Sequence, residues 1–356
     1  MCGIKFMPAV RFIWLCLIII LGSCAAPEVE KKPVNTVWPL PPAEPKIKFI
    51  EEISSKEDVE EITKSEFLKG LIAGPRDVNN RLVRPYGIAI DKDGRLYVTD
   101  IGRVFVFDKR NKSLLFVGDK PDAGQLKMPI CVAISPDGRI YVSDAVYGKV
   151  FIYKSDGKFL GEIGRADELK GPAGIAIDPV RERIYVVNTK KNSVMAYTVD
   201  GRFLFSIGGH PEDKYKLSLP TNIAVDSEGN IYVVDTGNFR VHIFNSDGKL
   251  SRTIEGGKKG SFIRPKGIAV DSEGNIYVVD AAAQKFFVFD KEGNFSLSVG
   301  KGGIEPGQFS VPAGITVDDE DRIYVADQMN GRIQIFQCLS KKWQSAQQSQ
   351  KQTNGQ

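Results

Sequence analysis

The chain has 356 residues, of which 42% are hydrophobic and 26% charged, a composition typical of a globular protein with a large core. Its net charge of +4 falls to +2 if the first 23 residues are removed, because Lys5 and Arg11 leave with them. So small an excess does not indicate a nucleic-acid partner, and none is expected.

Residues 1–23 are predicted to be an export signal. Lys5 and Arg11 precede an apolar run, Phe12 to Leu21, that is too short for a membrane-spanning helix, which needs about 20 residues. The run ends in Leu21-Gly22-Ser23-Cys24, which resembles the bacterial lipobox. That resemblance implies acylation of Cys24, cleavage before it and attachment to the membrane through acyl chains. The alternative is an ordinary cleaved signal with a chance cysteine.

Two segments flank the predicted folded body. Residues 24–45 are rich in proline, which favours an extended, semi-rigid tether, and residues 340–356 form a Gln- and Ser-rich tail that we expect to be disordered. Cys24 is followed by Ala25 and Ala26, and neither position has the aspartate that would resemble an inner-membrane retention signal. We therefore expect an exported, lipid-anchored protein on the outer membrane facing the periplasm, or at the cell surface.

A repeat occupies the chain between these segments. It opens at Pro85, Pro129, Pro172, Pro220, Pro265 and Pro312, at intervals of 43 to 48 residues. Each unit has four short β-rich runs separated by turns such as Asp93-Gly94 and Glu228-Gly229, which suit tight hairpins. One four-stranded meander buries too little surface alone, so the units must stack around an axis as a propeller.

The opening of unit five, Pro265-Lys266-Gly267-Ile268-Ala269-Val270-Asp271, is followed by Ile276-Tyr277-Val278-Val279-Asp280. Six consecutive segments of this kind resemble the NHL repeat over residues 46–339. The resemblance implies an all-β fold, a monomeric six-bladed β-propeller of the NHL/TolB-like type. NHL propellers of other proteins serve as interaction or ligand-sensing modules.

The ends of the propeller are predicted to meet in blade six. The sixth repeat lacks a fourth strand, while Phe49 to Ile53 resembles the outer strands Phe159–Ile163 and Phe203–Ile207. We expect this N-terminal strand to complete blade six. Ser54-Ser55-Lys56-Glu57 then resembles a helix capping box, which predicts a short helical insertion from Ser55 to about residue 69 before blade one.

An aspartate ends the second strand of most repeats, and a basic residue follows five positions later. Four pairs are predicted to be structural clamps that brace the adjoining loop: Asp144 with Lys149, Asp235 with Arg240, Asp280 with Lys285, and Asp327 with Arg332. Blade three replaces both members together, with Asn188 and Ser193. A catalytic or metal-binding ring is the alternative reading.

Two repeats depart from glycine at the third position of the opening motif, with Cys131 and Asn222. These are candidates for the channel mouth, unless they are tolerated variation. Six-bladed lactonases, which resemble this fold, hold a central calcium ion with Glu, Asn and Asp side chains. No acidic partner can be placed beside Asn222, and the acidic segments at Asp91 and Asp318 occupy ordinary hairpin turns. No catalytic residue, metal site or cofactor is therefore predicted, although calcium is left open.

The loops that enter each blade share a face with those joining the second and third strands. On this face basic, aromatic and other apolar residues gather, forming a candidate binding face or a merely solvated one: Lys190, Lys191, Phe239, Lys258, Lys259, Phe262, Arg264, Lys266 and Met329. The predicted function is a non-enzymatic envelope lipoprotein that binds a protein or polymer ligand. The rival is a calcium-dependent hydrolase of the lactonase type.

Overall fold

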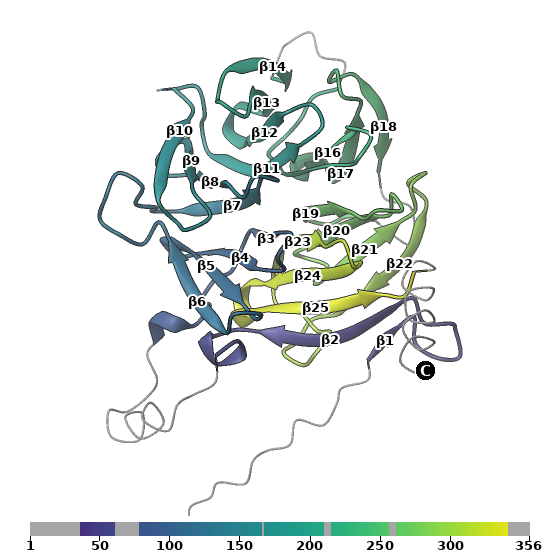
Figure 1. Cartoon of the computed structure of the whole chain (residues 1–356). Coiled ribbons are helices and arrows are strands. Elements are labelled where there is room, and N and C mark those ends of the chain that lie inside the picture. The colour runs from purple at the N-terminus through teal and green to yellow at the C-terminus, as the bar shows by residue number, and fades with distance from the viewer. Residues whose placement is uncertain (1–35, 61–77, 166, 210–214, 256–260, 341–356) are drawn as a thin grey trace, which may run out of the picture. The chain divides into compact units, whose positions relative to one another are not determined.

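The computed structural model describes residues 36–60, 78–165, 167–209, 215–255 and 261–340. These residues form six antiparallel sheets arranged as blades around an axis, which confirms the all-β six-bladed propeller (Figure 1). The leader, Cys24 and the C-terminal tail lie outside the described residues. Within the described part of the chain, no helix is long and apolar enough to span a bilayer.

The strands of each blade are lettered A to D from the axis outward. Blade one contains β3 (Ile88–Ile90), β4 (Leu96–Asp100), β5 (Arg103–Asp108) and β6 (Ser113–Val117), and blade two contains β7 (Pro129–Ile134), β8 (Ile140–Asp144), β9 (Lys149–Tyr153) and β10 (Phe159–Ile163). Blade three contains β11 (Pro172–Asp178), β12 (Arg183–Asn188), β13 (Ser193–Thr198) and β14 (Phe203–Gly208), and blade four contains β15 (Pro220–Val225), β16 (Ile231–Asp235), β17 (Arg240–Phe244) and β18 (Leu250–Ile254). Blade five contains β19 (Pro265–Val270), β20 (Ile276–Asp280), β21 (Lys285–Phe289) and β22 (Phe295–Val299).

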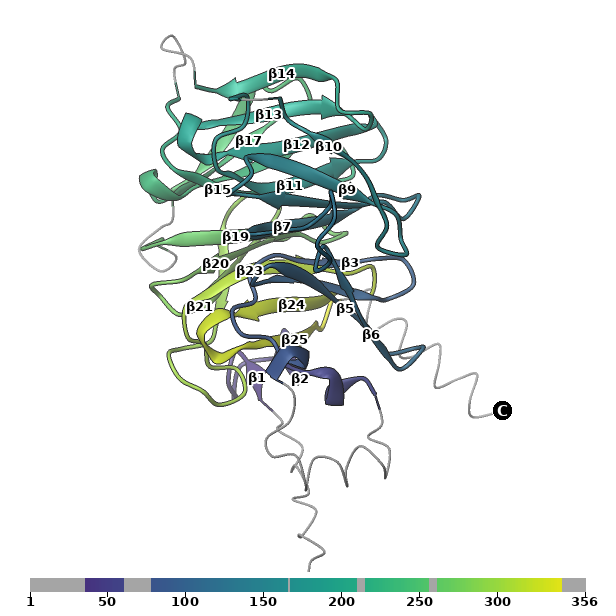
Figure 2. The ribbon, with the colours of Figure 1, turned by 90° about the vertical axis from the view of Figure 1, so that its left-hand side faces the viewer.

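Blade six joins the two ends of the propeller. It contains β23 (Pro312–Val317), β24 (Arg322–Asp327) and β25 (Arg332–Cys338), and its D strand is the N-terminal β2 (Ile47–Ile53), antiparallel to β25. Figures 1 and 2 both show purple β2 beside yellow β25. The short β1 (Val37–Trp38) extends this sheet beyond β2. Residues 36–45, assigned to the tether by sequence, therefore belong to the folded body.

Only the start of the predicted helical insertion, Ser55 to residue 60, lies among the described residues. Its described part contains a single 3-10 turn, η1 (Lys56–Asp58), and residues 61–77 lie outside the description. The backbone N–H groups of Ser54 and Ser55 donate to the Asp58 carboxylate at 2.7 and 2.9 Å. The capping acid is thus Asp58 rather than Glu57. A second 3-10 turn, η2 (Val78–Asn80), precedes blade one.

The core consists of six apolar clusters, one between each pair of adjacent blades. The B strands contribute most, because both of their faces are covered by neighbouring blades; β20, for example, is buried at every position. Full burial of one Val, Ile or Phe side chain contributes about 1.5–3 kcal/mol. Stacking between blades therefore supplies the burial that one meander lacks.

Candidate functional site

The connections of the propeller divide between two faces. Adjacent strands of a blade are antiparallel, so the DA loops, which enter each blade, and the BC loops lie on one face. We call this the loop face. The AB and CD turns lie on the opposite face, the turn face. Between them, a cavity of about 270 Å³ lies on the axis and is lined by the A strands of all six blades.

In five of the six blades, an aspartate ends the B strand and holds the adjoining loops of the loop face. Asp144 accepts hydrogen bonds from the backbone N–H groups of Lys127 and Met128 in the DA loop, at 2.7 and 2.8 Å. It also accepts from Val146 and Tyr147 in the BC loop, at 2.9 and 3.0 Å. Asp100, Asp235, Asp280 and Asp327 accept N–H groups of their DA loops in the same way. All five carboxylates are buried.

Two of the four predicted ion pairs are present. Arg240 Nε lies 3.0 Å from Asp235 Oδ2, and Arg332 Nε lies 2.8 Å from Asp327 Oδ2. The lysines behave differently. Lys149 pairs with Glu162 on the outer strand instead of Asp144, and Asp280 has no ion pair with Lys285 among the described residues.

Blade three keeps the clamp without the charge. Asn188 is fully buried, its Oδ1 accepts the backbone N–H of Lys170 at 2.8 Å, and its Nδ2 donates to the carbonyl of Glu168 at 3.0 Å. Because backbone groups are the shared partners in all six blades, the repeated acid is a structural feature of the loops. It supplies no free carboxylate for catalysis.

Cys131 and Asn222 both line the axial cavity. Cys131 is buried, its Sγ lies within 4.0 Å of the carbonyl of Ile175, and burial raises the pKa of its thiol to about 11. It is therefore neutral at physiological pH. Asn222 is half-buried, and its Oδ1 accepts the backbone N–H of Ile223 at 2.7 Å.

Tyr86 and Lys266 meet at the loop-face mouth of the channel, a contact that the sequence analysis missed. Lys266 Nζ lies 3.5 Å from Tyr86 Oη and 5.8 Å from the centre of the tyrosine ring. Each residue follows the opening proline of its blade, in blades five and one. Blade six lies between them and has only Ala313 at that position, so the two long side chains can meet above it. Comparison of this position across the repeats would have revealed the asymmetry.

The blades approach closely at this mouth. A Cβ atom on Gly267 would lie 2.5 Å from the carbonyl oxygen of Ala313, and one on Gly314 would lie 2.1 Å from that of Tyr86. Such contacts require glycine at these positions. Glycine thus allows the A strands of blades five, six and one to approach closely, next to the positions from which Lys266 and Tyr86 extend.

The predicted binding face is partly as expected. Phe239 and Met329 are 54% and 52% exposed, and Lys190, Lys191 and Arg264 are exposed as well. Phe262 is not on this surface: it is buried against Phe287 and Phe289 in the core between blades four and five. Lys258 and Lys259 lie outside the described residues.

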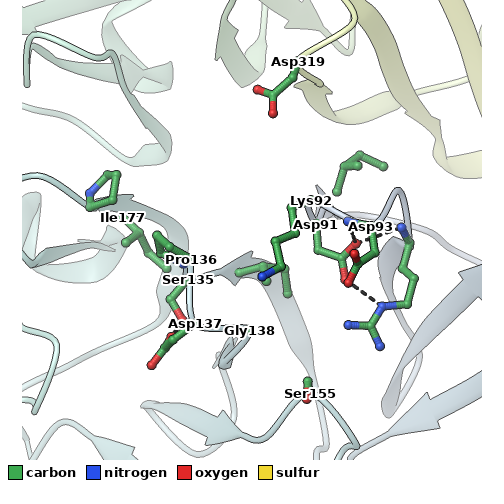
Figure 3. A pocket seen from close by; sticks show the side chains of 14 residues that line it. Asp91, Lys92, Asp93, Ser135, Pro136, Asp137, Gly138, Ser155, Ile177 and Asp319 are labelled. Atoms are coloured by element: carbon green, nitrogen blue, oxygen red, sulfur yellow. Dashed lines mark hydrogen bonds and ion pairs between the residues drawn. The ribbon is translucent and has the colours of Figure 1, made fainter.

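The turn face carries a larger cavity, of about 590 Å³, over blades one to three and the AB turn of blade six. Figure 3 shows Lys92, Asp93, Asp137 and Asp319 around it. Asp91 is already occupied, because it accepts the Tyr97 hydroxyl at 3.0 Å and the Arg95 guanidinium at 2.7 Å. Asp318 is bonded to Tyr324 and Arg322 in the same manner. In both acidic turns the first carboxylate is therefore hydrogen-bonded within its own hairpin, and the turns occupy the AB positions predicted from the sequence.

The calcium ion of the lactonases does not fit the described residues. No group of three His, Cys, Asp or Glu side chains is placed to hold a metal ion in the described part of the chain. Asn222 lines the axial cavity, and the cations Lys266 and Arg264 lie with Tyr86 at its loop-face mouth. A divalent cation prefers carboxylate and carbonyl oxygens. The mouth therefore presents the wrong sign of charge for calcium.

The sequence is similar to known propeller families. The profile of the SMP-30/Gluconolactonase/LRE-like region matches residues 85–263, about half of the chain. The chain belongs to this family. A second profile, described as a 6-bladed beta-propeller, matches residues 263–348. A search of curated proteins finds no significant match.

Solved structures support the fold. A protein of unknown function from Bacteroides thetaiotaomicron has a TM-score of 0.59 at 18% identity, covering 82% of this chain and 75% of its own. An auxiliary nutrient binding protein from the same organism has a TM-score of 0.57 at 13% identity, covering 72% and 69%. Virginiamycin B lyase from Staphylococcus aureus has a TM-score of 0.52 at 18% identity, covering 72% and 95%. At these identities the likeness extends to the propeller alone.

Proposed function

We propose that this family member is a non-enzymatic, lipid-anchored protein of the cell envelope, whose NHL-type propeller binds a protein partner through its loop face. The anchor is Cys24, and the site of action is the periplasmic side of the outer membrane or the cell surface. The distribution of exposed apolar side chains carries the proposal.

Large apolar side chains that remain exposed are concentrated in the DA and BC loops. They are Val83, Ile101, Met128, Val146, Tyr147, Leu219, Phe239, Ile263, Ile304, Val311 and Met329. Elsewhere in the described chain, the AB turns expose only Val180, and the outer D strands expose one each in five blades: Ile50, Leu115, Leu160, Phe203 and Leu250. Exposed apolar side chains gathered on one face mark an interaction surface.

Basic residues interrupt this apolar surface, among them Lys190, Lys191 and Arg264. Aromatic residues, Met and Arg are enriched at protein interfaces, and a basic surface favours an acidic partner. Enzymatic action has weaker support, because the clamp acids are bound to backbone groups and the mouth lacks a calcium ligand set. A partner protein with apolar and acidic side chains fits the loop face best.

The experiment is cross-linking in intact cells. Phe239→Ser and Met329→Ser should abolish one specific cross-linked product, while Leu160→Ser, which removes a 46% exposed leucine from the outer strand β10, should not. Equal loss in the Leu160 control, or retention of every product in the loop variants, would refute the proposal. Binding of the unlipidated protein to vesicles through Phe239 would also refute it, since the occupant would then be a membrane.

A further inference from the structure

Lys266 lacks an anionic partner in the described structure. Its side chain is half-buried, and no carboxylate of the described residues lies within ion-pair distance of its ammonium group. Among the described residues, its ammonium donates to the Tyr86 hydroxyl alone, at 3.5 Å, which occupies one of its three donors. An unpaired charge that is partly removed from water carries a desolvation cost.

A second cation increases that cost. Arg264, two residues earlier on the same DA loop, is near enough to lower the pKa of both Lys266 and Tyr86 electrostatically. Burial is the larger cause in each case, lowering the pKa of Lys266 and raising that of Tyr86 to about 12. The protein therefore holds two positive charges together beside a neutral phenol. Residues that reduce stability in this way are common where a ligand is bound.

The axial cavity begins beside this pair, because its lining includes Gly87 and Ile268, which lie one and two residues after Tyr86 and Lys266. The A strands stand at the inner edge of their sheets, with no further strand beside them, and they line the axial cavity of about 270 Å³. The half-buried Asn222 also lines this cavity, and its Nδ2 has no hydrogen-bond partner in the described chain. The pair thus offers an ammonium and a hydroxyl beside the cavity, and Asn222 adds an amide to the cavity lining.

We propose that the axial mouth binds an anionic oxygen group of a ligand, a carboxylate or a phosphate, through Lys266 and Tyr86, with Arg264 adding attraction. The site lies at the centre of the loop face and deepens the function proposed above. It does not require a protein partner to form. Charge-assisted hydrogen bonds from an ammonium and a neutral hydroxyl suit one anionic oxygen group.

The test is thermal unfolding of the purified, unlipidated propeller in acetate, in inorganic phosphate and in chloride, at equal ionic strength. The wild-type Tm should rise in acetate or phosphate relative to chloride, and the active anion identifies the chemical class. Lys266→Met should remove this rise, and Tyr86→Phe should reduce it. Lys285→Met is the control, because Lys285 is half-buried in the same blade but lies on the C strand, and it should keep the full response.

A response that persists in Lys266→Met would show an adventitious ion only and overturn the inference, as would the absence of any response in the wild type. Chemical-shift perturbation by the active anion is the second readout. Shifts should centre on residues 86–87 and 266–267, and shifts confined elsewhere would contradict the site. Because no envelope partner is present, failure here leaves the loop-face proposal standing, and failure of cross-linking leaves the anion site standing.

Discussion

His242 Nε2 lies 3.3 Å from Asp235 Oδ2, the same oxygen that accepts a hydrogen bond from Arg240 Nε. The histidine is buried in the C strand of blade four, and its Nδ1 lies 2.9 Å from Thr253 Oγ1. Blade six has a similar arrangement, with Gln334 Nε2 3.0 Å from Asp327 Oδ2 beside Arg332. The two blades with an Asp–Arg pair thus also carry a polar C-strand side chain that reaches the acid.

The first prediction concerns coupling within this cluster. Asp235→Ala should lower the free energy of unfolding by about 3–5 kcal/mol, because it leaves buried donors without an acceptor. Arg240→Ala should cost less, since that side chain is 25% exposed. A double-mutant cycle by urea denaturation should give a coupling of about 1 kcal/mol or more. The same cycle for Asp280 and Lys285, which form no ion pair, should be additive. Additivity in both cycles would show that the ion pair of Arg240 with Asp235 contributes no measurable free energy to folding.

The second prediction concerns acid stability. Burial alone would raise the pKa of Asp235, but His242, the Ser218 N–H, Asn238 and Arg240 together hold it below the usual value of 3.8. A lowered folded pKa gives stability that is complete above 3.8 and lost as pH falls toward the folded pKa. Wild type should therefore lose more free energy of unfolding than Asp235→Asn between about pH 5 and about pH 3. Equal losses would place the acid sensitivity elsewhere.

The third prediction concerns ring closure. Phe49 on β2 packs against Phe336 of β25 with ring centres 5.7 Å apart, and it is 6% exposed. Phe49→Ala should cost about 3–5 kcal/mol. Its neighbour Ile50 is 44% exposed on the same strand, and Ile50→Ala should change stability by no more than about 0.5 kcal/mol. Chemical denaturation measures both, and similar costs would mean that β2 contributes only backbone pairing.

The propeller and the closure of its ring could be predicted because the sequence motif is repeated. Six copies of one motif reveal which positions are shared, and the missing fourth strand of blade six identifies β2 as its replacement. The clamps were predicted only in part. Arginine can reach a buried acid with Nε while Nη2 donates to loop carbonyls, as Arg332 does to Glu305 and Gln308 at 3.1 Å. A lysine in the same register has no such fork, and Lys149 instead pairs with Glu162.

The contact of Tyr86 with Lys266 could not be read from any single repeat. It joins residues 180 positions apart across a blade that contributes only Ala313, so it depends on the circular order of the blades. The prediction for Phe262 was wrong. A loop position predicted as exposed is buried, because the DA loop folds back onto Phe287 and Phe289. Pattern specifies strands, whereas loop paths depend on packing between blades.

The fourth prediction concerns the anchor. Cys24→Ala should abolish incorporation of labelled palmitate and leave the precursor uncleaved, because the thiol that accepts the lipid is gone. Cys131→Ala is the matched control, since its buried thiol is neutral and lies within the propeller. Radiolabelling and membrane fractionation measure the result. Normal labelling of the Cys24 variant would end the lipoprotein proposal.

The last prediction separates the binding function from its hydrolytic rival. Reversing charge with Lys190→Glu and Arg264→Glu should weaken cross-linking to the envelope partner while changing Tm by no more than about 1–2 °C. Only the backbone N–H of Arg264 bonds to the clamp acid Asp280, and both side chains are exposed. The wild-type interaction should weaken with added salt, since exposed charges are screened beyond about 8–10 Å at physiological ionic strength. A calcium-dependent lactonase would behave in the reverse way: rim charges would have little effect, while Asn222→Ala would remove metal and activity. Calcium bound stoichiometrically to the wild type and lost in Asn222→Ala, with every cross-link retained in the charge-reversed variants, would establish the rival.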